Sequence, residues 1–112
     1  MKLDETIVFN QIKSSSRVID LGCGDGQLLD ALIQKKQCAA YGVEQNFKSV
    51  LMAMEKGIPT FQGDILEGLK QFDDNAFDVA ILSQTLQQVM NPIDVIQELC
   101  RVSKSAIVTF PN

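Results

Sequence analysis

Short apolar runs alternate with stretches of helical periodicity along the whole chain. The apolar runs predict β-strands at Arg17–Leu21, Ala39–Val43, Pro59–Gln62, Phe77–Leu82 and Ala106–Phe110. Strands that alternate with helices are typical of a parallel sheet covered by helices on both faces. The pattern therefore predicts an α/β fold with a doubly wound parallel sheet, whose ligand crevice lies at the carboxyl ends of the strands.

Helical periodicity fills the segments between these runs. Helices are predicted for residues 4–12, 27–36 and 46–56 and from Pro92 onward, with a helical turn at Ile65–Leu69. The side chains expected to face the core are Ile7, Val8 and Ile12, then Leu28, Leu29, Leu32 and Ile33, then Phe47, Val50, Leu51 and Met54, and finally Ile93, Ile96, Leu99 and Cys100. The Phe and Met stripe of the third helix is interpreted as core packing.

Composition narrows the class of protein. With 112 residues, 46% of them apolar, the chain suits one globular domain and not a disordered one. A net charge of −4 without a basic cluster disfavours nucleic-acid binding, and no apolar stretch is long enough to span a membrane. The complete absence of histidine excludes Ser-His-Asp and Cys-His catalysis.

The three cysteines include no CxxC pair, and the first residues carry acids where a secretion signal would carry basic residues. Both features favour a reducing, cytoplasmic location. Cys38 and Cys100 are expected to be small buried hydrophobic residues.

A glycine-rich loop follows the first predicted strand. Residues 20–26 read Asp-Leu-Gly-Cys-Gly-Asp-Gly, and a dinucleotide-binding G-x-G-x-x-G motif would need glycine where the chain has Gln27. Glycines in such a loop allow a ligand to approach the backbone, next to the free N–H groups of the following helix. A purely structural turn is the alternative interpretation of the loop by itself.

Polar residues also follow the next three predicted strands. Glu44 ends the second strand, where its carboxylate suits the two hydroxyls of a ribose, while Asp64 and Ile65 follow the third and suit an adenine. Ser83 follows the fourth. Glu44 and Asp64 have an alternative role as acidic residues at helix N-termini. Together with the glycine loop, however, the four positions favour a nucleoside site.

These segments carry a family resemblance. VIDLGCGDG, YGVE, QGDI and FDVAILS resemble the successive motifs of class I S-adenosylmethionine-dependent methyltransferases over nearly the whole chain. Residues 20–26, 41–44, 81–87 and 106–112 are more specifically similar to the MetW family of methionine-biosynthesis proteins. The resemblance implies a Rossmann-like fold and contacts to S-adenosylmethionine from Asp20, Gly22, Cys23, Gly24, Glu44, Gln45, Asp64, Ile65 and Ser83.

The resemblance also assigns these contacts to parts of the donor. Asp20 and Gly22 would lie near its methionine moiety, Glu44 at the ribose, Asp64 and Ile65 at the adenine, and Ser83 at the amino acid end. Cys23 would contribute its backbone. We do not expect a thiol nucleophile there, because no base or cation is evident nearby to lower its pKa.

The chemical role is less specified than the donor site. The Asn-Pro-Pro-aromatic signature of amino-methylating enzymes is absent after the fourth strand, no acceptor site is evident, and Asp25 and Gln84 are general-base candidates by location alone. The family resemblance leaves two main roles open. One is a small-molecule methyltransferase, and the other is a non-catalytic partner of homoserine O-acyltransferase. A structural remnant that binds no ligand is a third, less favoured role.

Methyltransferases of this kind continue past the fifth strand, so we expect residues 1–112 to be one cofactor-binding domain truncated after that strand. Residues 105–110 are apolar on both faces and carry no charge. An unpaired strand of this kind is a template for pairing with another chain. The sequence thus predicts either self-association through this strand or a longer protein that covers it.

Overall fold

The computed structural model describes residues 1–83 and 91–109, and five parallel strands in this part of the chain form one sheet. The strands are β1 (Arg17–Leu21), β2 (Ala39–Glu44), β3 (Thr60–Gln62), β4 (Phe77–Ser83) and β5 (Ser103–Thr109). The helices are α1 (Leu3–Gln11), α2 (Gln27–Lys36), α3 (Phe47–Glu55), α4 (Ile65–Leu69) and α5 (Pro92–Val102). Their order along the chain and the parallel pairing confirm the predicted doubly wound α/β fold.

The sheet order β3-β2-β1-β4-β5 places β1 at the centre. From β1 the chain builds outward through β2 to β3 and then crosses to β4 and β5 on the other side. In a sheet of this kind the ligand crevice lies where the strand order reverses, outside the carboxyl ends of the central strands. Here that point is the end of β1, between β2 and β4.

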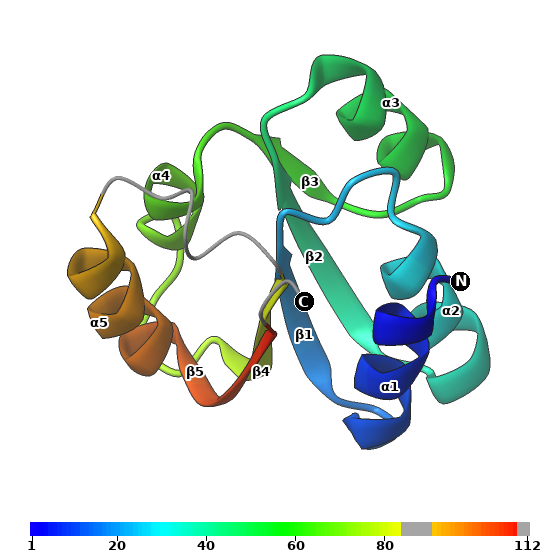
Figure 1. The fold of residues 1–112 in the computed structure, drawn as a ribbon, viewed down its shortest axis with the longest axis horizontal. Helices are drawn as coiled ribbons and strands as arrows, with labels where there is room; N and C mark the ends of the chain where they lie inside the picture. Colours follow the sequence, from blue (N-terminus) through cyan, green and yellow to red (C-terminus); the bar gives the residue numbers. More distant parts are fainter. Residues whose placement is uncertain (84–90, 110–112) are drawn as a thin grey trace.

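Two layers of helices enclose two cores, one on each face of the sheet (Figure 1). On one face α1, α2 and α3 pack over alternate strand residues such as Val18 and Ile81. On the other face α4 and α5 cover the intervening residues, including Ile19 and Leu82. Because side chains alternate along a strand, Asp20 and Glu44 lie on the same face as α1, α2 and α3.

The predicted inward face of α5 is right for Leu99 and wrong for Ile93, Ile96 and Cys100. Val95, Leu99 and Val102 are buried, whereas Ile93 is 71% exposed, Ile96 is 46% exposed and Cys100 is exposed. The helix carries two apolar stripes, and only one of them can face the sheet. Since α5 passes directly into β5 at Ser103, Val102 must lie at the sheet, and this fixes the buried stripe. The prediction of a buried cysteine holds for Cys38 and fails for Cys100.

The predicted inward faces of α3 and α1 are only partly right. In α3, Val50 is buried as expected, but the other side chain on the buried face is the small Ala53. The predicted core residues Phe47, Leu51 and Met54 are exposed instead. The reason is the close approach of α3 to Gly26, which leaves room there for a methyl group and not for a larger side chain. In α1, Val8 and Ile12 are buried, and Ile7 is 50% exposed.

Strand β5 begins earlier than expected and contains a charge. Its second residue, Lys104, lies 3.6 Å from the carboxylate of Asp78 on β4, which also pairs with Arg17 at 3.0 Å. The expectation of a strand without a charged residue is therefore wrong. A lysine on an edge strand also disfavours pairing with another chain. Within the described residues β5 is an edge of the sheet, and self-association through it stays a prediction.

No helix in residues 1–83 and 91–109 is both long and apolar enough to cross a membrane.

Candidate functional site

The glycine loop after β1 is tied to the end of β2 by backbone hydrogen bonds. The amides of Gly22 and Cys23 both donate to the carbonyl oxygen of Val43, at 2.8 and 3.1 Å. Gly22, Gly24 and Gly26 all have positive φ angles, of 90°, 59° and 84°. Residues that carry a side chain rarely adopt such backbone angles. The glycines thus let the chain turn sharply from the sheet into α2.

Two of these glycines have contrasting surroundings. At Gly26, the N-cap of α2, an added Cβ would lie 2.6 Å from Cδ1 of Ile58 and 3.2 Å from Cβ of Ala53. At Gly24, an added Cβ would meet nothing within 4 Å. The loop therefore packs tightly against the protein at Gly26 and is open at Gly24, where a ligand could approach its backbone.

Glu44 joins this loop to the start of α3. One carboxylate oxygen accepts a hydrogen bond from the amide of Gly24 at 2.9 Å, and the other accepts one from the amide of Asn46 at 2.8 Å. Asn46 in turn caps α3 by accepting from the amide of Ser49. Each carboxylate oxygen can accept more than one hydrogen bond, so these contacts leave capacity for the hydroxyls of a ribose. Gln45 is exposed beside Glu44.

Asp64 is the N-cap of α4. Its carboxylate accepts from the amide of Glu67 at 2.7 Å, and the Glu67 side chain accepts from the amide of Asp64 at 3.4 Å. This capping box is the structural role that the sequence left open for Asp64. Ile65 opens the same helix and packs against the core under α4 and α5, and contact of either residue with an adenine stays a prediction.

Asp20 is a buried carboxylate near the end of β1, and only 5% of the residue is exposed. Within residues 1–83 and 91–109 no donor forms a hydrogen bond with it. Burial, followed by the charges of Glu5 and Glu44, raises the pKa of Asp20 to about 7. A buried carboxylate without a donor is costly, so the site suits a ligand that brings one, above all an ammonium group.

Glu5, which no sequence motif singles out, influences the site through its charge, because that charge contributes to the raised pKa of Asp20. It lies in the first turn of α1, a helix whose far end is held against α2 by Lys36. The Lys36 ammonium donates to the carbonyl oxygens of Phe9 and Ile12, at 2.5 and 2.6 Å. No motif or spacing relates Glu5 to Asp20, because their proximity depends on how α1 packs on the sheet.

The thiol of Cys23 points back into the protein. Burial and the charges of Asp20 and Glu44 raise its pKa to about 12, so the thiol stays protonated at neutral pH. An added Cβ at Gly42 would lie 2.5 Å from its sulfur, which shows how closely β2 packs over it. These surroundings agree with a packing role for the side chain and not with a nucleophile.

Of the two general-base candidates and Ser83, the structure describes Asp25 and Ser83 but not Gln84. Asp25 lies 3.8 Å from the ammonium of Lys56, and its carboxylate accepts from the amide of Gln27. Ser83 is the last residue of β4, in register with Thr109 of β5. Gln84 lies outside the described residues, as do most of the SQTLQ segment and the closing FPN.

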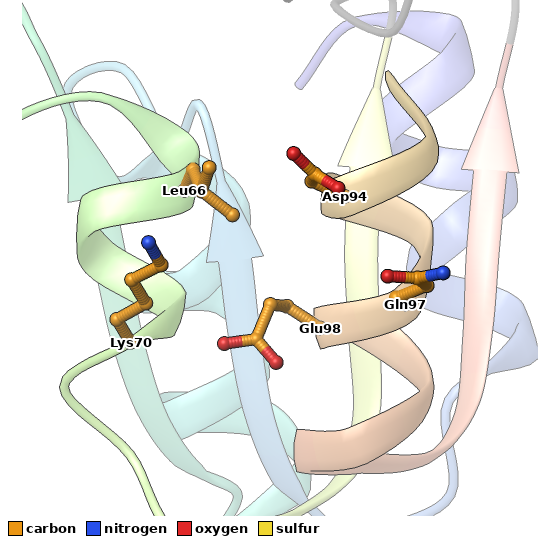
Figure 2. Close-up of a pocket in the computed structure, with 5 residues that line it drawn as sticks. All are labelled: Leu66, Lys70, Asp94, Gln97 and Glu98. Atoms are coloured by element: carbon orange, nitrogen blue, oxygen red, sulfur yellow. The ribbon is translucent and has the colours of Figure 1, made fainter. Parts of the chain in front are cut away.

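A separate hollow lies between α4 and α5, on the opposite face of the sheet. Figure 2 shows Leu66 and Lys70 of α4 facing Asp94, Gln97 and Glu98 of α5 across it. Its volume is about 310 Å³, and its lining is mostly charged. None of the residues expected at the nucleoside site lines this hollow, so it is distinct from that site.

A doubly wound sheet with a glycine loop after β1 and a carboxylate at the end of β2 defines the class of Rossmann-like, class I methyltransferase folds. Solved structures agree with this class. A methyltransferase from Thermotoga maritima, described as a possible histamine N-methyltransferase, has a TM-score of 0.73 at 24% identity, and the match covers 95% of this chain and 49% of that one. The cyclase SpnF has a TM-score of 0.77 at 25% identity, covering 89% and 40%.

The chain belongs to the MetW family, since the family model for "Methionine biosynthesis protein MetW" matches residues 2–112. A bifunctional methionine biosynthesis protein MetXA/MetW from Rhodopirellula baltica is 36% identical over 120 residues, which cover 100% of this chain and 19% of the relative. A ubiquinone biosynthesis O-methyltransferase from Paracidovorax citrulli is 33% identical over 94 residues, covering 79% and 39%. The chain thus spans well under half the length of these curated relatives.

Proposed function

We propose that residues 1–112 form one domain that binds S-adenosylmethionine at the carboxyl ends of β1 and β2. The observation that carries this proposal is the buried carboxylate of Asp20, which has no hydrogen-bond donor among residues 1–83 and 91–109 and lies beside a loop that is open at Gly24. The ammonium of the methionine moiety would supply the donor. Glu44, with Gln45 beside it, would accept from the ribose.

The remaining contacts follow from the same placement. The loop backbone at Gly22, Cys23 and Gly24 would lie along the donor, Ser83 near its amino acid end, and Asp64 and Ile65 at the adenine. S-adenosylmethionine supplies a methyl group that is already activated for transfer. The task of the protein is therefore to bind and orient, and a small-molecule methyltransferase needs no general base from these residues. We place this activity in the cytoplasm.

Replacing Glu44 with alanine is expected to weaken S-adenosylmethionine binding more than tenfold, because it removes the ribose acceptor and the anchor of the Gly24 amide. Titration calorimetry on the wild-type chain should detect S-adenosylmethionine and S-adenosylhomocysteine but not NAD. Glu44→Gln, which keeps one acceptor oxygen, should lose less affinity.

Asn46→Ala is the matched control, since it removes the cap of α3 and leaves Glu44 in place. This variant should lower thermal stability while retaining affinity for the nucleoside. Equal affinity of the wild type and Glu44→Ala would refute the assignment of Glu44.

A second role is favoured by the relative from Rhodopirellula baltica, which is named as bifunctional for MetXA and MetW. In that protein the part similar to this chain is 19% of the length. The family resemblance connects MetW to homoserine O-acyltransferase, and we propose this enzyme as a partner of the chain.

The partner proposal predicts that the chain co-purifies with homoserine O-acyltransferase and changes its activity when added in stoichiometric amount. The measurement is acyltransferase rate with and without the chain, alongside a pull-down. Glu44→Ala separates the two roles, because a purely structural partner would keep its effect when nucleoside binding is lost. Unchanged rate and no physical association would exclude the partnership.

A further inference from the structure

Helix α3 is apolar on two faces. Val50 and Ala53 are buried and supply its contact with the core. Phe47, Leu51 and Met54 lie on a second face and are exposed, Phe47 by 57%. Single exposed apolar residues are ordinary on a protein surface, whereas several that follow one another along a helix face indicate a surface for binding another protein. These three residues are called the α3 stripe below.

The α3 stripe faces outward from the molecule. Figure 1 shows α3 at the rim of the fold, where it packs on β2 and on the edge strand β3. The glycine loop lies on the other side of the helix, since Ala53 is the residue of α3 that approaches Gly26. The exposure of the stripe shows that no residue of the described ranges covers it.

Two charged residues border the stripe at its ends. Lys48 follows Phe47, and Glu55 follows Met54, so both charges lie on the same side of the stripe. They are seven positions apart, about 10 Å along the helix axis, which is too far for an ion pair with each other. Among residues 1–83 and 91–109, neither of them forms an ion pair with any other side chain. The stripe therefore has one positive end and one negative end.

We infer that the α3 stripe binds a second copy of the chain, with the two α3 helices antiparallel about a two-fold axis near Leu51. Both copies use the same surface in a two-fold interface, so that surface must be complementary to itself. Leu51 lies near the midpoint between Lys48 and Glu55, and antiparallel pairing therefore brings each Lys48 to the partner's Glu55. The apolar residues are four and then three positions apart, which is also the spacing of the seam between two packed helices.

The size of the stripe predicts a weak dimer. Three apolar side chains and two charges per copy are far fewer than the roughly 20–30 residues that each partner contributes to a standard stable interface. Exposed ion pairs add little free energy and are screened by salt. We therefore expect a reversible dimer with a dissociation constant of about 10–100 μM, which rises with salt concentration.

The test is sedimentation equilibrium of the whole chain at low salt, from about 5 to 500 μM, a range that brackets the expected dissociation constant. The mass of the wild type should rise from monomer towards dimer. Lys48→Glu and Glu55→Lys each place like charges together at both ends of the pairing, so each variant alone should raise the dissociation constant at least fivefold. An equal mixture of the two variants should recover association as a heterodimer, because each copy then supplies the charges that the other lacks.

Leu51→Glu should leave the chain monomeric over the whole range. Ile96→Glu is the matched control, because it makes the same kind of change on the exposed apolar side of α5, and it should associate like the wild type. Circular dichroism checks that each variant is folded.

Three outcomes would overturn the inference. The first is a wild type that stays monomeric at every concentration, and the second is a dimer that survives Leu51→Glu and so uses another surface, such as the edge of β5. The third is a mixture of folded Lys48→Glu and Glu55→Lys variants that associates no better than either alone. The proposed nucleoside site is tested separately and stands or falls without this dimer.

Discussion

Gly26→Ala is expected to lower the free energy of unfolding by about 2–5 kcal/mol, as the sum of backbone strain and overpacking. Alanine is disfavoured at the φ angle of 84° that this position requires. Its Cβ would also lie 2.6 Å from Cδ1 of Ile58 and 3.2 Å from Cβ of Ala53. Either α3 or the loop must therefore move, and the measurement is urea unfolding followed by circular dichroism.

Gly57→Ala is the matched control, because Gly57 has the same φ angle of 84° and its added Cβ would meet nothing within 4 Å. Gly57→Ala should lower the free energy of unfolding by the backbone strain alone, roughly 1–2 kcal/mol. Adding Ile58→Val, which removes the Cδ1 atom, should recover part of the loss in Gly26→Ala. Equal losses at positions 26 and 57 would show that packing against Ile58 and Ala53 is unimportant.

Asp20→Asn is expected to raise the free energy of unfolding at pH 8 by up to about 4 kcal/mol, since burial raises the pKa of Asp20 from 3.8 to about 7. Between these two pH values the folded state holds a proton that the unfolded state has released. The stability of the wild type therefore falls as pH rises from about 4 to 7 and then levels off. Asparagine carries no charge and removes this loss.

The measurement is the difference between the unfolding free energies of the wild type and Asp20→Asn at each pH, because this difference cancels groups that titrate in both proteins. It should be small near pH 4 and grow up to pH 7. A variant that is no more stable than the wild type at pH 8 would contradict the burial of an ionisable Asp20. The same variant should bind S-adenosylmethionine more weakly, so stability and ligand binding make opposite demands on this residue.

The strands were predictable because they are short, apolar and separated by turn residues. β1, α2 and α4 have the bounds expected from the sequence, and the other elements differ by a few residues at their ends. The buried faces of α3 and α5 were less accessible to prediction. Both helices carry more apolar residues than one face can hold. The packing of Ala53 against the glycine loop fixes the buried face of α3, and the position of Val102 next to β5 fixes that of α5.

Some features of the candidate site were predictable from the sequence and others were not. That Asp20, Glu44 and the glycine loop lie close together follows from the rule that parallel strands bring their carboxyl ends to one edge. The hydrogen bond from Gly24 to Glu44 and the capping box of Asp64 depend on local geometry, which the motifs do not specify. The effect of Glu5 on Asp20 depends on the packing of a helix that belongs to no motif.

Because β1 lies at the centre of the sheet, its two neighbours arrive at very different times during synthesis. β2 follows it closely, whereas the bond from the Arg17 amide to Asp78 on β4 joins residues 61 positions apart. At about 5–20 residues per second, a ribosome needs roughly 3–12 s to cover that distance. Throughout this interval one edge of β1 has no partner strand, while the Gly24–Glu44 hydrogen bond joins residues that have already been made. The nascent chain is therefore most exposed to mispairing between the completion of β2 and the emergence of β4.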